Sequence, residues 1–247
     1  MSFTPTDYEA LLTQLDSLRD ERYRLFNEKL IPGKQNATLG VRMPLLRGVA
    51  RQLCRGDWRA FLDCEAVRQS TLHEMVLLAG IVTAIAPCST AERLERTAAF
   101  LPRVQDWAVC DTVCASYRIP PADRPVWQEF LRPYLTCGQE FAERFALVLL
   151  MDRFLDKDCT DADAAFVLQA CALARCPAYY TRMAAAWALC TCFCRRPEQT
   201  ERFLCSTAGQ GLDGTVWDLF LRKCRESRLV SPADAARLAA LRPHAAP

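Results

Sequence analysis

The sequence of 247 residues predicts an all-α fold, and three of its features support that prediction. Glycine, which is costly inside helices, is scarce at 9 residues, whereas alanine, leucine and arginine, which favour helices, are abundant. No stretch alternates strictly between apolar and polar side chains, as a half-buried strand would. An apolar fraction of 51% is enough to build a core and excludes a disordered chain.

Apolar residues recur at helical spacing from residue 6 to residue 30, which predicts one long first helix. In the connection that follows, Gly40 can adopt a positive φ and Pro44 fits the first turn of the next helix. That second helix continues through Cys54, and Asp57 can cap a short helix after it.

Helix boundaries in the rest of the chain are set by prolines, glycines and capping residues. We expect these helices at 71–86, 89–102, 107–117, 122–135, 138–156, 160–175, 178–195, 197–206, 213–226 and 231–241. Connections of two to six residues are typical of adjacent antiparallel helices. No linker rich in glycine or serine divides the chain, so we predict a single domain over residues 1–247, with 242–247 as a frayed tail.

Four residues lie along the chain at spacings typical of a helical repeat: two tryptophans, an aspartate and an arginine. Trp107 and Asp111 are one helical turn apart and share a helix face. Arg144 lies 37 residues after Trp107, and Trp187 lies 43 residues after Arg144. Both steps match the period of about 40 residues of HEAT-like helix pairs, whose equivalent positions line one concave surface. The sequence therefore predicts a single superhelical solenoid with these four residues in one groove. The alternative is that the tryptophans are core residues and that the aspartate is a helix cap.

The charge of the chain is unevenly distributed, although its net value is only +2. Residues 19–59 carry ten Lys/Arg and four Asp/Glu, and residues 175–230 carry nine and five. Residues 137–165 are acidic instead. A curved solenoid could bring its two basic ends around one groove, and a basic groove suits a polyanion. The plainer alternative is that these charges are solvated helix faces.

Cysteine is frequent at 14 residues, but histidine is rare at 2 and no pair of cysteines has zinc-site spacing. We therefore expect no metal and no cofactor, and we expect the thiols to be small buried side chains of a reduced cytoplasmic protein. No signal peptide and no membrane-spanning segment is expected. His73-Glu74 lacks the second histidine of a zinc-protease helix, so a role at a helix start or on the surface is expected. The three remaining tryptophans are predicted to lie in the core: Trp58, Trp127 and Trp217.

Several segments together resemble one family, the AlkD-like DNA alkylation repair glycosylases, which are solenoids of HEAT-like repeats. The resemblance extends from Tyr23 to Ser231 and rests on five short segments. Their order and spacing together point to the family more specifically than any single segment does. The segments are at 39–47, 106–111 (AspTrpAlaValCysAsp), 141–146, 183–188 and 223–231.

The resemblance implies a catalytic role for Asp111, with Trp107 and Trp187 beside the damaged nucleotide and Arg144 on a phosphate. The family's substrates are purines alkylated at N3 or N7 in double-stranded DNA. Such a base is cationic and leaves without a general acid, while a carboxylate stabilises the oxocarbenium-like sugar and positions water. The family is thought to act without flipping the base into a pocket.

A basic segment about one repeat beyond Trp187 offers further candidate phosphate contacts, at Arg222, Lys223, Arg225 and Arg228. The family's founding members have two N-terminal helices, where this sequence predicts one. Two alternatives remain: a relative that binds DNA without excising the base, and a protein-binding HEAT-repeat scaffold. We expect a monomer.

Overall fold

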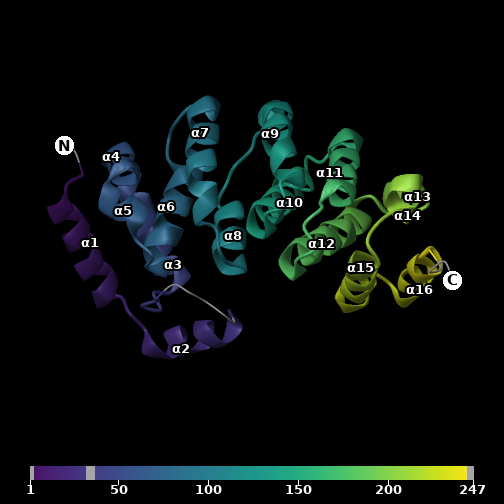
Figure 1. Cartoon of the computed structure of the whole chain (residues 1–247), viewed down its shortest axis with the longest axis horizontal. Coiled ribbons are helices and arrows are strands. Elements are labelled where there is room, and N and C mark those ends of the chain that lie inside the picture. The colour runs from purple at the N-terminus through teal and green to yellow at the C-terminus, as the bar shows by residue number, and fades with distance from the viewer. Residues whose placement is uncertain (1–2, 32–36, 244–247) are drawn as a thin grey trace. The chain divides into compact units, whose positions relative to one another are not determined.

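A computed structural model describes residues 3–31 and 37–243 of the chain. Its regular structure over these residues consists of sixteen α-helices and three short 3₁₀ helices, with no strand (Figure 1). The predicted all-α fold is confirmed. No helix of the described ranges is long and apolar enough to cross a membrane.

The chain divides into two compact units, Met1–Arg118 and Ile119–Pro247. The helices of the first unit are α1 (Pro5–Ser17), α2 (Glu21–Leu30), α3 (Met43–Leu53), α4 (Trp58–Asp63), α5 (Glu65–Gln69), α6 (His73–Ile85), α7 (Thr90–Phe100), η1 (Leu101–Arg103) and α8 (Trp107–Cys114). Those of the second are η2 (Pro121–Asp123), α9 (Arg124–Leu131), η3 (Arg132–Thr136), α10 (Glu140–Phe154), α11 (Asp161–Leu173), α12 (Tyr179–Arg195), α13 (Pro197–Leu204), α14 (Thr207–Gln210), α15 (Gly214–Glu226) and α16 (Pro232–Ala240).

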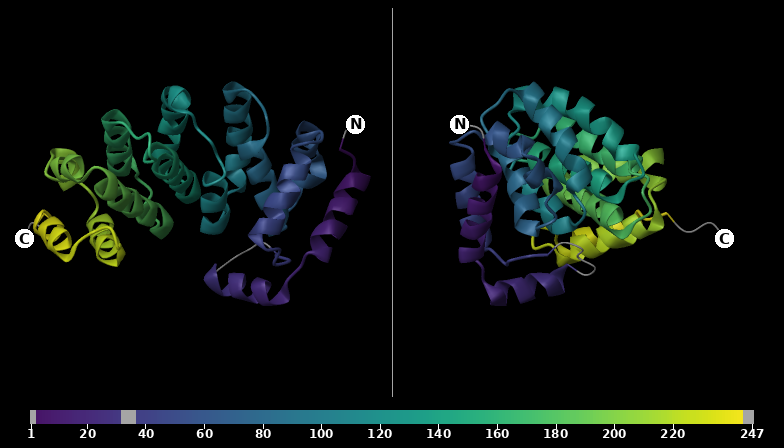
Figure 2. Two further views of the ribbon diagram at one scale, coloured as in Figure 1. Left: turned by 180° about the vertical axis from the view of Figure 1, so that it is seen from behind. Right: turned by 60° about the vertical axis from the view of Figure 1, so that its left-hand side comes forward.

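The prediction of one long helix over residues 6–30 is wrong, because the chain turns between α1 and α2 (Figures 1 and 2). Asp20 is responsible for the turn. Its backbone is extended, with φ −133°, and one carboxylate oxygen accepts from the Tyr23 amide at 2.9 Å and so caps α2. The other oxygen accepts from the Arg42 side chain at 2.8 Å. An aspartate that bonds to the backbone in this way favours a helix start over a helix interior.

The first unit is built around α6, in which every residue from His73 to Ala84 is buried. Helices α3, α7 and α8 all pack against it. At its start, the buried Glu74 carboxylate accepts from the amides of Leu39, Gly40 and Val41. Gly40 has φ +77°, as its place in the connection predicted, and an added Cβ there would lie 2.5 Å from a backbone oxygen. The start of α6 therefore fixes the connection that leads into α3.

In the second unit, α12 packs against α10, α11 and α15. Contacts between helices that are near in sequence are what a helical repeat requires. Trp127 and Trp217 are buried in this unit, as Trp58 is in the first, and the three predicted core positions are confirmed. Arg242, in the predicted tail, pairs with Asp218 at 2.6 Å, and residues 244–247 lie outside the described ranges.

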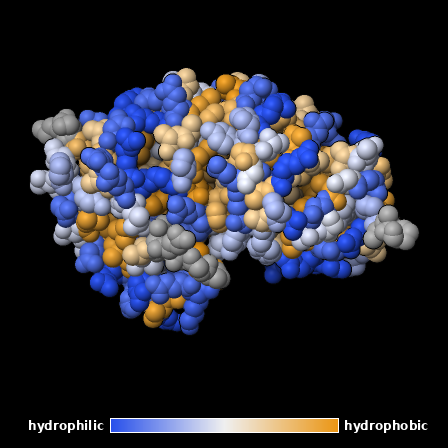
Figure 3. Space-filling model, in the orientation of Figure 1, coloured by the Kyte–Doolittle hydropathy of each residue, from blue (hydrophilic) through white to orange (hydrophobic). Residues whose placement is uncertain are grey.

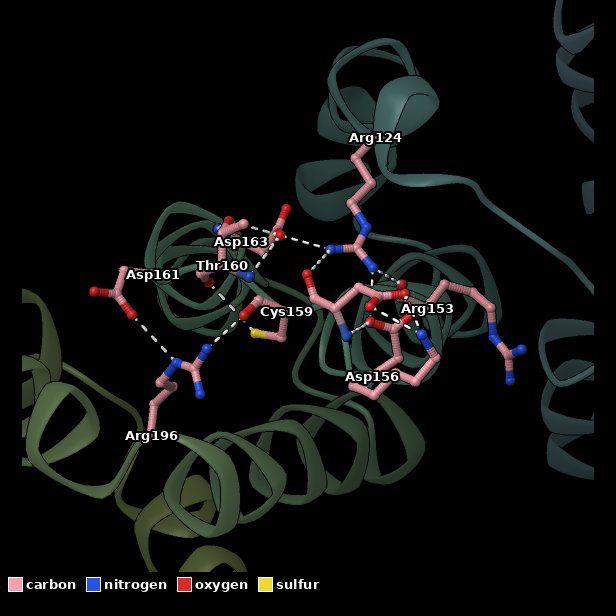
Figure 4. Close-up of polar contacts among 10 residues, drawn as sticks. Arg124, Arg153, Asp156, Cys159, Thr160, Asp161, Asp163 and Arg196 are labelled. Carbon is pink, nitrogen blue, oxygen red and sulfur yellow. Dashed lines mark hydrogen bonds and ion pairs between the residues drawn. The ribbon is translucent and has the colours of Figure 1, made fainter.

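A buried arginine joins helix α9 to the segment that leads into α11 and to α11 itself (Figure 4). The Arg124 guanidinium, at the start of α9, lies 2.7 Å from the carboxylates of both Asp156 and Asp163 and 3.0 Å from the Asp158 carbonyl. Asp163 also completes a capping box with Thr160 at the start of α11. One cation thus ties α9 to the loop before α11 and to α11 itself. Burying a cation costs free energy of desolvation, which the attraction of the paired carboxylates offsets.

Candidate functional site

The start of α8 holds two of the predicted site residues, Trp107 and Asp111. The preceding residue, Asp106, is buried and accepts from the Val109 amide at 2.8 Å, so it is the N-cap of this helix. The cap fixes where α8 begins, and therefore the direction in which its first two turns present their side chains. Trp107 and Asp111 are both half-buried.

Trp107 and Asp111 line the same cleft, with a volume of about 230 Å³. We call it the Trp107 cleft. Its other walls come from α2, from the connection into α3 and from the first turns of α6, and they include Tyr23, Phe26, Val41, Met43, His73 and Leu77. The cleft is thus a mainly apolar and aromatic space whose lining includes the carboxylates of Asp111 and of the buried Glu74. An apolar wall strengthens the interaction of the Asp111 carboxylate with a cation, because it excludes water.

His73 and Glu74 also line the Trp107 cleft, and sequence reasoning missed them as site residues. They begin α6, as expected, but the alternative of a surface position is wrong, since they are only 4% and 2% exposed. The His73 Nδ1 lies 3.7 Å from an Asp106 carboxylate oxygen. A polar pair in the first turn of an otherwise mostly apolar helix was the available signal, because buried polar residues need partners in the fold.

Helix α2 closes one side of the Trp107 cleft and buries none of its own residues. Phe26 is 55% exposed, and Leu25 and Leu30 are nearly as exposed. Hydrophobic side chains accordingly show on this helix at the lower edge of Figure 3. Because the sequence predicted one uninterrupted helix here, it gave no indication of this wall.

In the second unit, Arg144 lies on α10 and is only 4% exposed. Its Nη1 donates to the Tyr180 carbonyl at 3.0 Å, and its guanidinium lies 5.7 Å from the centre of the Tyr180 ring. Tyr180 belongs to α12, and its ring also contacts Phe141 and Tyr179. The arginine is therefore positioned by an aromatic group at the starts of α10 and α12.

Trp187 lies on α12 and is 37% exposed, so it is not a core residue. Tyr180 lies seven residues before it, which is close to two helical turns and places both on one face of α12. Tyr180 was not among the site residues predicted from the sequence, although its spacing from Trp187 was visible there. That Trp107, Asp111, Arg144 and Trp187 line one groove stays a prediction.

Three of the predicted phosphate contacts lie near the end of α15, which packs against α12, and Arg228 follows two residues after that helix ends. Arg222 and Lys223 share Glu226 as an ion-pair partner, at 3.8 and 3.5 Å. Arg225 and Arg228 are exposed. A helix C-terminus favours basic residues in any case, so the position alone does not assign a role in DNA binding.

Neither the Trp107 cleft nor any other place in the described ranges gathers three or more His, Cys, Asp or Glu side chains that could hold a metal ion. The Trp107 cleft presents the Asp111 carboxylate beside aromatic rings. Such a pair of groups suits a positively charged ligand, through charge attraction and cation–π contact.

The fold and this site together define a class of protein. It is an all-α protein built of stacked helices, with a carboxylate and aromatic residues in a cleft. A sequence model of the family described as DNA alkylation repair enzyme matches residues 11–216. The chain therefore belongs to the DNA alkylation repair enzyme family, whose work is the repair of alkylated DNA, and the predicted resemblance is confirmed. No curated protein and no solved structure matched the chain.

Proposed function

We propose that this protein is a DNA glycosylase that hydrolyses the N-glycosidic bond of purines carrying an alkyl group at N3 or N7 in double-stranded DNA. The observation that carries the proposal is the Trp107 cleft, in which a carboxylate and an aromatic ring share one mainly apolar space in a member of a DNA alkylation repair family. A damaged base of this kind is cationic, and the cleft offers what a cation prefers.

Catalysis follows from the charge of the substrate. The bond between C1′ and the base nitrogen breaks, and its electron pair neutralises the departing base, so no general acid is needed. The sugar becomes oxocarbenium-like, and the Asp111 carboxylate stabilises that positive charge. Water then adds at C1′, and its proton passes to the Asp111 carboxylate, which acts as the base.

The other predicted residues have binding roles in this proposal. Trp107 and Trp187 present their π faces to the charged nucleotide. Arg144 holds a phosphate of the DNA backbone, and the basic end of α15 contacts further phosphates. We also propose a cytoplasmic, monomeric protein.

The test is single-turnover release of 7-methylguanine or 3-methyladenine from a duplex, with the affinity for the same duplex measured alongside. Asp111→Asn keeps the size of the side chain and removes its charge. We expect the excision rate to fall by about 100-fold or more while affinity changes little, because the lost interaction exists only in the transition state.

The matched control is Asp16→Asn, which makes the same change on an exposed residue of α1. It should release base at the wild-type rate. Equal rates for wild type and Asp111→Asn would remove Asp111 from the mechanism. Salt-sensitive duplex binding without any base release would favour the DNA-binding relative, and no duplex binding at low salt would favour the scaffold.

A further inference from the structure

A second cleft of the first unit lies apart from the Trp107 cleft and is larger, with a volume of about 790 Å³. Its walls come from α4, α5, α7 and η1, and Ala79 and Thr83 of α6 form part of its floor. His73 and Leu77 of α6 face the Trp107 cleft instead. At about 100° per residue, the two pairs point roughly 120° apart around α6, so the clefts occupy different sides of that helix.

The charged groups of this second cleft are not balanced. Five charged side chains line it, three basic and two acidic. Arg96 is paired with Asp63, and the Glu65 carboxylate accepts from the Gln69 amide at 2.8 Å. The two remaining cations, Arg68 and Arg103, have no carboxylate partner among the residues that the structure describes. We call this site the Arg68 cleft.

Arg103 is the more buried of these two cations. It donates one hydrogen bond, from Nη2 to the Ser70 carbonyl at 3.0 Å. Burial, and next the positive charge of Arg68, lower the pKa of Arg103 below its usual value. Arg103 is partly dehydrated and feels the positive charge of the exposed Arg68, so an anion bound beside both would relieve the repulsion and replace the hydration that Arg103 has lost.

We propose that the Arg68 cleft binds a phosphate group, carried by a small phosphomonoester or present as free phosphate. The guanidinium fork matches phosphate oxygens in two parallel hydrogen bonds, and two such forks suit a dianion. Beside them, Ala99 and Leu62 offer an apolar surface for an organic group. The volume lies within the range of about 300–1,000 Å³ that is usual for small-molecule sites.

The experiment is calorimetric titration of the whole protein with two probes, inorganic phosphate and adenosine 5′-monophosphate. Arg68 is exposed, so Arg68→Gln should fold normally, and we expect it to weaken the binding of either probe at least tenfold. Arg103→Met should do the same. Arg55→Gln, the same change at an exposed arginine outside the cleft, should leave both affinities unchanged.

The two probes separate the two sources of the phosphate. Tighter binding of the nucleotide by about tenfold, the factor that burial of roughly 60 Å² of apolar surface supplies, would assign a phosphomonoester. Equal affinities would assign free phosphate.

Three results would overturn the proposal. They are no binding of either probe, equal losses in Arg68→Gln and Arg55→Gln, and a tenfold loss of duplex affinity in Arg68→Gln, which would make the cleft a DNA contact. The Arg68 variant should also release alkylated base at the wild-type rate, so this test and that of the glycosylase proposal fail independently.

Discussion

Replacing Glu74 by glutamine should destabilise the first unit by about 2–4 kcal/mol. The Glu74 Oε1 accepts from the Thr38 hydroxyl at 2.8 Å and from the amides of Leu39, Gly40 and Val41 at 3.1, 2.8 and 3.2 Å. Its Oε2 accepts from the Leu39 amide at 3.1 Å as well. Hydrogen bonds to a charged acceptor contribute about 1.5–3 kcal/mol each, against about 0.5–1.5 for a neutral one.

A glutamine at this position can keep its carbonyl oxygen where Oε1 lies and so retain most of these donors. Its amide nitrogen would then face the Leu39 amide, donor against donor. Weakening several bonds by about 1 kcal/mol each, without full additivity, gives the range stated. Because Val41 and Met43 line the Trp107 cleft, the same change should slow base release.

The assay is urea unfolding followed by circular dichroism, together with single-turnover base release. Glu95→Gln is the matched control, since Glu95 is an exposed glutamate of α7 and should change the free energy of unfolding by less than about 0.5 kcal/mol. If Glu74→Gln is as stable as this control, the carboxylate does not hold the connection into α3, and the reasoning fails.

Three further outcomes are expected. Arg225→Gln should make the slope of log affinity for duplex DNA against log salt about 0.9 less negative if Arg225 meets a phosphate, whereas Arg55→Gln should leave the slope unchanged. Arg93→Met should cost about 1–3 kcal/mol in urea unfolding, since this guanidinium donates to three backbone carbonyls at the end of α6, and an unchanged midpoint would contradict that role. Burial raises the pKa of the Cys171 thiol from 9.0 to about 12. The unfolded chain therefore loses this proton at a lower pH than the folded protein, so the stability that the buried thiol contributes is complete below pH 9 and is lost as pH rises towards 12. Cys171→Ala should therefore flatten the fall in unfolding free energy between about pH 9 and 11, and an unaltered profile would count against it.

Local signals in the sequence predicted several helix starts well. Asp57 and Ser89 cap α4 and α7 as expected, because a capping side chain needs only the amides two or three residues ahead. Gly40 was identified for an equally local reason, the need for a positive φ in a tight connection.

Features that depend on distant partners were not predictable in the same way. The break before α2 rests on Asp20, whose second partner is Arg42, 22 residues later. The burial of Glu74 likewise depends on amides 33 to 35 residues earlier in the chain. Periodicity could place Trp107 and Asp111 on one face of a helix, but it could not show that α2 turns back to form the opposite wall of their cleft.

Helix α2 buries none of its residues, and this affects how easily the helix opens by local unfolding. A segment with little apolar burial opens at a small fraction of the free energy of global unfolding, as native-state hydrogen exchange reveals in other proteins. The amides of α2 should therefore exchange with solvent far sooner than those of α6, all but the last residue of which are buried. One wall of the Trp107 cleft would then fluctuate while the opposite wall stays closed, so the width of the cleft would vary without disturbing the core.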